Sequence, residues 1–150
     1  MGTIRGAASV EIDAPIAEVY AVCADQASAP EWQDGLQSLR ILERDARGRA
    51  LVGETVNDAK VRSVRSRVRF RYDEPRLVAW RQEEGDPKSV DGAWELEDLG
   101  GGRTRATYRL EVDPGRMLGM LIRGPVEARL RQLLVEGRPD ELRRRMAAGG

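Results

Sequence analysis

The stretch most suggestive of chemistry is an arginine-rich run at residues 61–75, VRSVRSRVRFRYDEP. Clustered guanidinium groups bind phosphates, so a nucleic-acid surface is the first function to consider. The spacing predicts a half-buried strand instead, because arginines alternate with apolar or small side chains and an extended chain sends alternate residues to opposite faces. The inward set would be Val64, Ser66, Val68, Phe70 and Tyr72, and the outward set Arg65, Arg67, Arg69 and Arg71.

The outward arginines have candidate partners on later segments. Glu83, Glu95 and Glu97 can share this exterior face with them and with Arg103 and Arg105. Cross-strand pairs of opposite charge stabilise a sheet by roughly 0.2–1 kcal/mol each. A surface for single-stranded nucleic acid would also need exposed aromatic side chains among the arginines, which this run lacks. We therefore expect a solvated ion-pair face and no nucleic-acid partner.

Residue types used in many hydrolases are missing from this chain. It has no histidine and one cysteine, Cys23, which excludes Ser-His-Asp and Cys-His nucleophile systems, ordinary zinc sites and an intrachain disulfide. Cys23 is expected to be a buried free thiol. Asp25, Glu31 and Asp34 lack a metal-ligand spacing. The sequence predicts no metal and no cofactor.

Length and charge indicate one domain over residues 1–150 without a strong overall field. Lys plus Arg and Asp plus Glu number 25 each, so nothing draws the whole protein to a polyanion or an anionic membrane. The N-terminus has no signal-peptide core, and no segment approaches the roughly 20 apolar residues that a membrane helix needs. We expect a cytoplasmic protein that is a monomer or a homodimer.

The order of predicted elements is strand, helix pair, six strands and long helix, which is an α+β architecture. Residues 4–13 alternate as a strand, and Ile16, Val19, Tyr20 and Cys23 form the apolar stripe of a short helix. Pro30 should end the helical region before it, so that residues 31–35 are a loop or a second short helix. Strands in successive antiparallel hairpins are predicted at residues 36–45, 49–58, 64–72, 77–84, 90–99 and 104–113.

The last quarter of the chain is predicted to leave the sheet and enter the long helix. Ile122, Val126, Leu130, Leu133 and Leu134 would line its buried side, and Gly137 and Pro139 should break or bend it. An apolar segment precedes this stripe. Its members have two interpretations, first core turns of the helix or a flexible gate at a cavity mouth: Met117, Leu118, Met120, Leu121 and Ile122.

Three motifs carry a resemblance to a known family. They are "I-x-A-P-x-x-x-V-Y" at Ile12–Tyr20, "P-x-W" at Pro30–Trp32 and "G-x-W-x-L…G-x-T-x-x-x-Y" at Gly92–Tyr108. Together they resemble the START-like, helix-grip (SRPBCC) superfamily, and within it the polyketide cyclase/dehydrase and lipid-transport group. The resemblance implies a seven-stranded, curved antiparallel sheet wrapped around a long C-terminal helix, with two short helices after the first strand. It also implies an apolar cavity that takes lipids, quinones or polyketides.

The candidate ligand wall consists of the aromatic residues expected on the inner face, with Tyr72 and Tyr108 as hydrogen-bonding groups: Trp32, Phe70, Tyr72, Trp80, Trp94 and Tyr108. The alternative is that these side chains simply fill the core. The sequence also leaves two choices for the inward side chains of the strand at residues 50–58. They are Leu51, Gly53, Thr55 and Asn57, or Val52, Glu54 and Val56. We favour the first set, since the second would bury the Glu54 carboxylate.

Three functions follow from this reading. The first is binding or carriage of a small hydrophobic molecule between the sheet and the C-terminal helix. The alternative is a polyketide cyclase/dehydrase of the aromatase/cyclase kind, working without metal or histidine; whether any reaction is catalysed is left open. The resemblance implies for such enzymes a tyrosine early in the second strand, where Leu36 stands here. A less favoured function is a ribosome- or chaperone-associated interaction protein.

Overall fold

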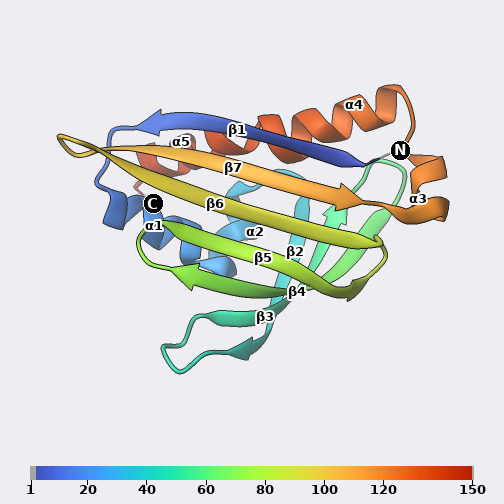
Figure 1. Cartoon of the computed structure of the whole chain (residues 1–150), viewed down its shortest axis with the longest axis horizontal. Helices are drawn as coiled ribbons and strands as arrows, with labels where there is room; N and C mark the ends of the chain where they lie inside the picture. The colour runs from blue at the N-terminus through green and yellow to red at the C-terminus, as the bar shows by residue number, and fades with distance from the viewer. Residues whose placement is uncertain (1–2, 150) are drawn as a thin grey trace.

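The computed structural model describes residues 3–149 and has one sheet covered by helices on one side (Figure 1). The strands are β1 (Ile4–Ile12), β2 (Leu36–Arg44), β3 (Ala50–Asp58), β4 (Ser63–Asp73), β5 (Leu77–Gly85), β6 (Ser89–Gly100) and β7 (Arg103–Asp113). The helices are α1 (Ile16–Ala24), the 3₁₀ turn Gln26–Ser28, α2 (Ala29–Trp32), α3 (Gly115–Leu121), α4 (Pro125–Arg131), the π-helical Gln132–Glu136 and α5 (Arg138–Ala147).

The sheet is antiparallel throughout, in the order β1-β7-β6-β5-β4-β3-β2. Consecutive strands from β2 to β7 pair as hairpins, and β1 completes the order by pairing with β7 from Ile4 opposite Val112 to Ile12 opposite Thr104. The segment from α4 to α5 runs along β1 and β7, and α1 and α2 lie on the same face of the sheet beside α5 (Figure 1). The predicted helix-grip fold is therefore confirmed.

The prediction for the second short helix was wrong at its start. Helix α2 begins at Ala29, one residue before Pro30, and ends at Trp32. Ala29 has helical backbone angles, φ −53° and ψ −42°, although a residue preceding proline usually avoids them. Proline is tolerated in a first helical turn because its missing N–H would have no partner there.

The predicted long helix is divided in two places. Helix α3 is separate from α4, since Gly124 has a positive φ of 57° and Pro125 opens the next helix, so Ile122 does not lie on the long helix. Further along, the Gly137 N–H donates to the Gln132 carbonyl five residues back, at 2.9 Å. This π-type turn accommodates Pro139, which has no N–H to continue an α-helix, and the chain remains helical through α5.

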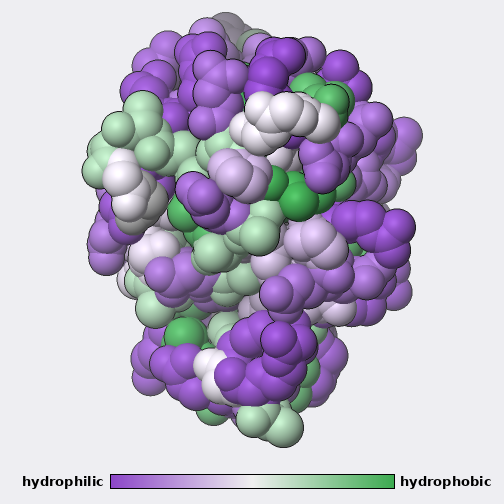
Figure 2. Space-filling view, turned by 90° about the vertical axis from the view of Figure 1, so that its left-hand side faces the viewer, coloured by the Kyte–Doolittle hydropathy of each residue, from purple (hydrophilic) through white to green (hydrophobic). Residues whose placement is uncertain are grey.

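Burial follows the alternation predicted for the arginine strand. Val64, Ser66, Val68 and Phe70 are buried on β4, and Tyr72 is half-buried. On the outer face guanidinium and carboxylate groups form ion pairs: Arg65 with Glu84 (2.7 Å), Arg69 with Glu83 (2.7 Å), Arg105 with Glu97 (2.9 Å) and Arg109 with Glu95 (2.7 Å). The predicted ion-pair exterior is confirmed. Hydrophilic residues also surround a band of apolar surface on the end face in Figure 2.

The favoured facing of β3 is confirmed for Gly53, Thr55 and Asn57. Their register partners are Val68, Ser66 and Val64, which belong to the inner set of β4. Glu54 points to the exterior and pairs with Arg40 and Arg65, both at 3.1 Å. Of the described helices, none combines the length and the apolar character needed to cross a membrane.

Candidate functional site

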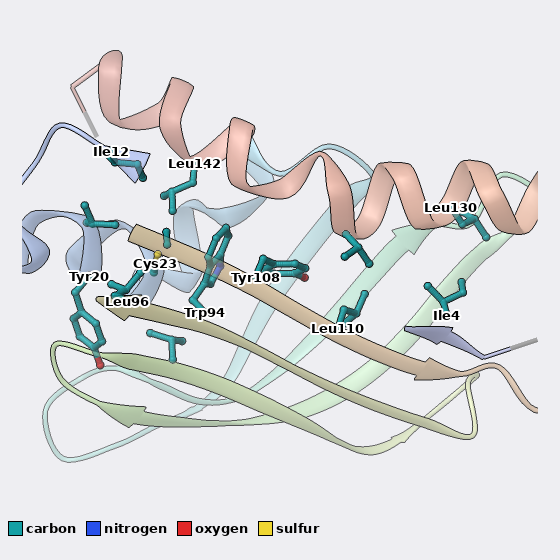
Figure 3. Packing of buried hydrophobic residues seen from close by; sticks show 14 of the residues in the cluster. Ile4, Ile12, Tyr20, Cys23, Trp94, Leu96, Tyr108, Leu110, Leu130 and Leu142 are labelled. Atoms are coloured by element: carbon teal, nitrogen blue, oxygen red, sulfur yellow. The ribbon is translucent and has the colours of Figure 1, made fainter. Parts of the chain in front are cut away.

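A cavity of about 140 Å³ lies between the inner face of the sheet and the helices. Its wall includes side chains from β2 to β7, from α3 and from the C-terminal helical segment. Four of the six predicted ligand residues are on this wall: Phe70, Trp80, Trp94 and Tyr108. Trp94 and Tyr108 lie in the space between β7 and the C-terminal helix (Figure 3).

The aromatic side chains on the wall contact one another at defined angles. Trp94 and Tyr108, register partners on β6 and β7, meet edge to face with ring centroids 4.7 Å apart. The Trp80 ring centroid lies 5.7 Å from that of Tyr108. Gly92 makes room for Trp80, because a Cβ at this position would lie 2.4 Å from the indole ring. The glycine of the G-x-W motif therefore allows the Trp80 ring to lie close against β6.

The remaining two predicted residues are not on the cavity wall. Trp32 packs behind it, with its ring 6.2 Å from Trp94. The Tyr72 hydroxyl donates to the Ala50 carbonyl at 2.6 Å, and the Arg49 guanidinium lies 4.5 Å from the centre of its ring. Burial raises the pKa of Tyr72 to about 12. Tyr72 thus has a hydrogen-bond partner inside the protein, whereas Tyr108 faces the cavity.

A buried ion pair lies at the cavity wall, and it was not among the predicted site residues. Arg138 on α5 is 2% exposed, and its Nη1 donates to Glu141 Oε1 at 2.8 Å and to the Asp34 carbonyl at 2.7 Å. Glu141 Oε2 in turn accepts the Asp34 N–H at 3.1 Å. The two hydrogen bonds to Asp34 join α5 to the loop that follows α2. Arg138 is also part of the cavity wall.

Arg138 also lies beside Tyr108, with its Cζ 5.9 Å from the ring centroid. Burial raises the pKa of the Tyr108 hydroxyl, and the nearby Arg138 opposes that shift only in part. Burial alone would lower the pKa of Arg138, but Tyr108 and Glu141 outweigh it and raise the pKa overall. At neutral pH the wall therefore presents a protonated phenol and a guanidinium cation close together.

The segment at residues 117–122 has buried and exposed apolar side chains. Leu118 and Ile122 are buried and line the cavity, as first core turns would. Met117, Met120 and Leu121 are 83%, 60% and 51% exposed, so they are not core residues. Helix α3 is thus a thin part of the wall with an apolar outer surface.

Cys23 is confirmed as a buried free thiol on α1, and burial raises its pKa. A thiol becomes nucleophilic only as the thiolate. Its environment therefore gives no basis for a reactive role. The chemistry that the described site can supply comes from the donors of Tyr108 and Arg138 in an otherwise largely apolar space.

Solved structures with the same architecture place this fold in a class. A START superfamily protein from Mycobacterium smegmatis aligns with a TM-score of 0.81 and 18% identity, over 96% of this chain and 97% of its own. A protein of Thermus thermophilus aligns with a TM-score of 0.81 and 23% identity, over 97% and 99%. The ZhuI aromatase/cyclase from a Streptomyces species aligns with a TM-score of 0.77 and 21% identity, over 99% of each chain. The fold is that of START-like, helix-grip proteins.

The sequence identifies the family within that class. Residues 3–138 match the model of the family "Polyketide cyclase / dehydrase and lipid transport", and the chain belongs to this family. A comparison with curated proteins finds no significant match.

Proposed function

We propose that the chain, as a single domain over residues 1–150, binds or carries a small hydrophobic molecule in the cavity between the sheet and the C-terminal helix. The observation that carries this proposal is an apolar, aromatic-lined cavity of about 140 Å³ with a few polar groups on its wall. Ligand sites typically have this composition. A cavity of roughly 150 Å³ lined by apolar side chains can hold benzene, so the present volume suits a ligand part of about one ring.

A larger lipid, quinone or polyketide would need the wall to open. Helix α3 is the candidate, because Leu118 and the following Ile122 line the cavity while Met117 and Met120 remain exposed. Gly115, the first residue of the helix, and Gly124, three residues past its end, have φ of 80° and 57°. We propose that residues 117–122 act as a gate through which the ligand enters.

The second candidate function is catalysis of the cyclase/dehydrase kind. The observation in its favour is the pair of donors on the wall, Tyr108 and Arg138, because donors aimed at a developing oxyanion stabilise it strongly in a site without water. Leu36 occupies the cavity wall at the start of β2, where the aromatase/cyclase pattern would have a tyrosine. Binding without turnover is therefore the better supported function.

Filling the cavity tests the binding proposal. Val64→Phe adds a ring at a buried wall position on β4, whereas Val22→Phe makes the same change at a half-buried site of α1 away from the wall. Binding of indane, a small bicyclic hydrocarbon, would be followed by isothermal titration. We expect V64F to lose at least about tenfold in affinity and V22F to retain the wild-type value. A folded V64F with unchanged affinity would remove the cavity as the binding site.

A further inference from the structure

Arg138 has hydrogen-bonding capacity that the protein does not use. A guanidinium has five N–H donors, and Nη1 of Arg138 donates to Glu141 and to the Asp34 carbonyl. Its Nε is buried without a partner. An unpaired donor in a buried place costs free energy, so an acceptor that reaches this group would be stabilised.

Three other polar side chains on the cavity wall already have hydrogen-bond partners. The Ser66 hydroxyl donates to Gln82 at 2.6 Å, and the Thr55 hydroxyl donates to the Ser66 carbonyl at 3.2 Å. The Gln26 amide donates to the Cys23 carbonyl at 3.4 Å. Arg138, with Tyr108 beside it, is the charged wall group that combines burial with an unpaired Nε donor. The polar end of the cavity therefore offers donors to an acceptor on the ligand.

The ion pair at this end of the cavity determines which acceptor groups of a ligand can bind there. Glu141 already neutralises Arg138 at 2.8 Å, and the two side chains are 3% and 9% exposed. A carboxylate ligand would bring an additional negative charge next to Glu141 into a largely apolar space, which carries a large desolvation cost. An uncharged carbonyl oxygen can accept the same hydrogen bonds without that cost.

We infer that this end of the cavity is a subsite for the carbonyl oxygen of an uncharged, ring-containing ketone or quinone, with Arg138 and Tyr108 as its donors. The inference rests on the proposed function, since it names the class of ligand for the same cavity. In this subsite the negative charge of Glu141 disfavours anionic ligands, which an unpaired arginine would attract.

Three probes with one skeleton test the subsite: indane, 1-indanone and indane-1-carboxylate. Their affinities would be measured by isothermal titration against the wild type and the double variant R138M/E141L. The double variant removes both charges together, so no unpaired ion is left buried. We expect the wild type to bind 1-indanone about tenfold more tightly than indane, and to bind the carboxylate no more tightly than indane. The double variant should bind 1-indanone and indane equally.

The possible outcomes distinguish failure of the subsite inference from failure of the proposal that the cavity binds a ligand. Equal affinity of the wild type for indane and 1-indanone would overturn the subsite while leaving the binding proposal intact. A ketone preference that persists in a folded R138M/E141L would also overturn it. Tight binding of the carboxylate would contradict the role of Glu141. Failure of the wild type to bind any of the three probes would reject the proposed function together with the inference.

Discussion

The arginines of β4 and Arg138 of α5 lie in opposite environments. Arg65 and Arg69 lie on the outer face of the sheet, where their side chains are 42% and 48% exposed and carboxylates occupy their donors. Arg138 lies on the inner side, 3% exposed, with one carboxylate partner and donors left over. The conspicuous arginine cluster is the one already paired with carboxylates. Arg138, outside that cluster, has a buried donor without a partner.

This difference shows that the number of arginines in a segment is a poor guide to a binding site. Of the 25 basic residues only Lys60 and Lys88 are lysines, so arginine occurs throughout the chain. What distinguishes Arg138 is low solvent exposure together with unpaired donors and a neighbouring cavity. Exposed charges are screened by water, whereas a buried charge interacts strongly with whatever lies beside it.

The largest effect is expected from breaking the inner ion pair. Glu141→Leu leaves the Arg138 cation buried with only the Asp34 carbonyl as acceptor, which should lower the free energy of unfolding by about 3–5 kcal/mol. Urea denaturation measures this loss. The double variant R138M/E141L should be more stable than E141L, because it has no unpaired ion. A loss below about 1 kcal/mol in E141L would make the inner pair equivalent to an exposed one.

A smaller effect is expected at Tyr72, the predicted ligand residue that hydrogen-bonds within the protein. Tyr72→Phe removes the bond to the Ala50 carbonyl and should cost about 1 kcal/mol of stability. Affinity for 1-indanone should not change, since Tyr72 is not on the cavity wall. Tyr108→Phe is the matched variant and should weaken that affinity. A loss of affinity in Y72F instead would return Tyr72 to the ligand site.

The outer ion pairs should contribute least. Glu83→Gln removes the partner of Arg69 and should change the free energy of unfolding by less than about 1 kcal/mol. The difference between E83Q and the wild type should shrink further in 1 M salt, where the Debye length is roughly 3 Å. Urea titrations at low and high salt would measure both values. A loss as large as that of E141L would contradict the distinction between the two faces.

Acid should weaken the outer face in a defined direction. Hydrogen bonding to Arg65 holds the pKa of Glu84 below its ordinary value, and Arg105 does the same for the pKa of Glu11. Their contribution to stability is present above the pKa of the unfolded chain, about 4.3, and is lost as the pH falls through the lower folded value. Unfolding at decreasing pH should show a smaller decline for Glu84→Gln than for the wild type. Identical pH profiles would show that this pair makes no contribution.

Much of the fold could be predicted from the sequence because strand periodicity and turn residues are local signals. The parity of residues 64–72 predicted the correct inner and outer faces of β4, and Gly92 to Tyr108 carried a motif of the family. Trp32 and Tyr72 were also expected on the ligand wall, but both lie off it. The alternation of residues along a strand predicts which face of the sheet a side chain points to. It does not predict whether a neighbouring backbone carbonyl or another ring comes between that side chain and the cavity.

Arg138 was missed because its segment was interpreted as a helix break. Gly137 and Pro139 do disturb the helix, but the π-type turn lets it continue and places Arg138 between the buried Val135 and Leu142. The spacing 135, 138 and 142 is that of one helix face. A charged residue on that stripe, with Glu141 three positions later, was the available signal. The hydrogen bonds to Asp34 depend on tertiary structure and could not be predicted from spacing.

The central claim is that the cavity holds a small hydrophobic molecule. Native mass spectrometry of the protein purified from its own host tests it most directly, followed by denaturing extraction and identification of the released compound. We predict a stoichiometric adduct that is lost on denaturation and is an uncharged, apolar ring compound carrying a carbonyl group. A protein that is empty and also fails to bind indane and 1-indanone would contradict the account, and the aromatic wall would then be packed core.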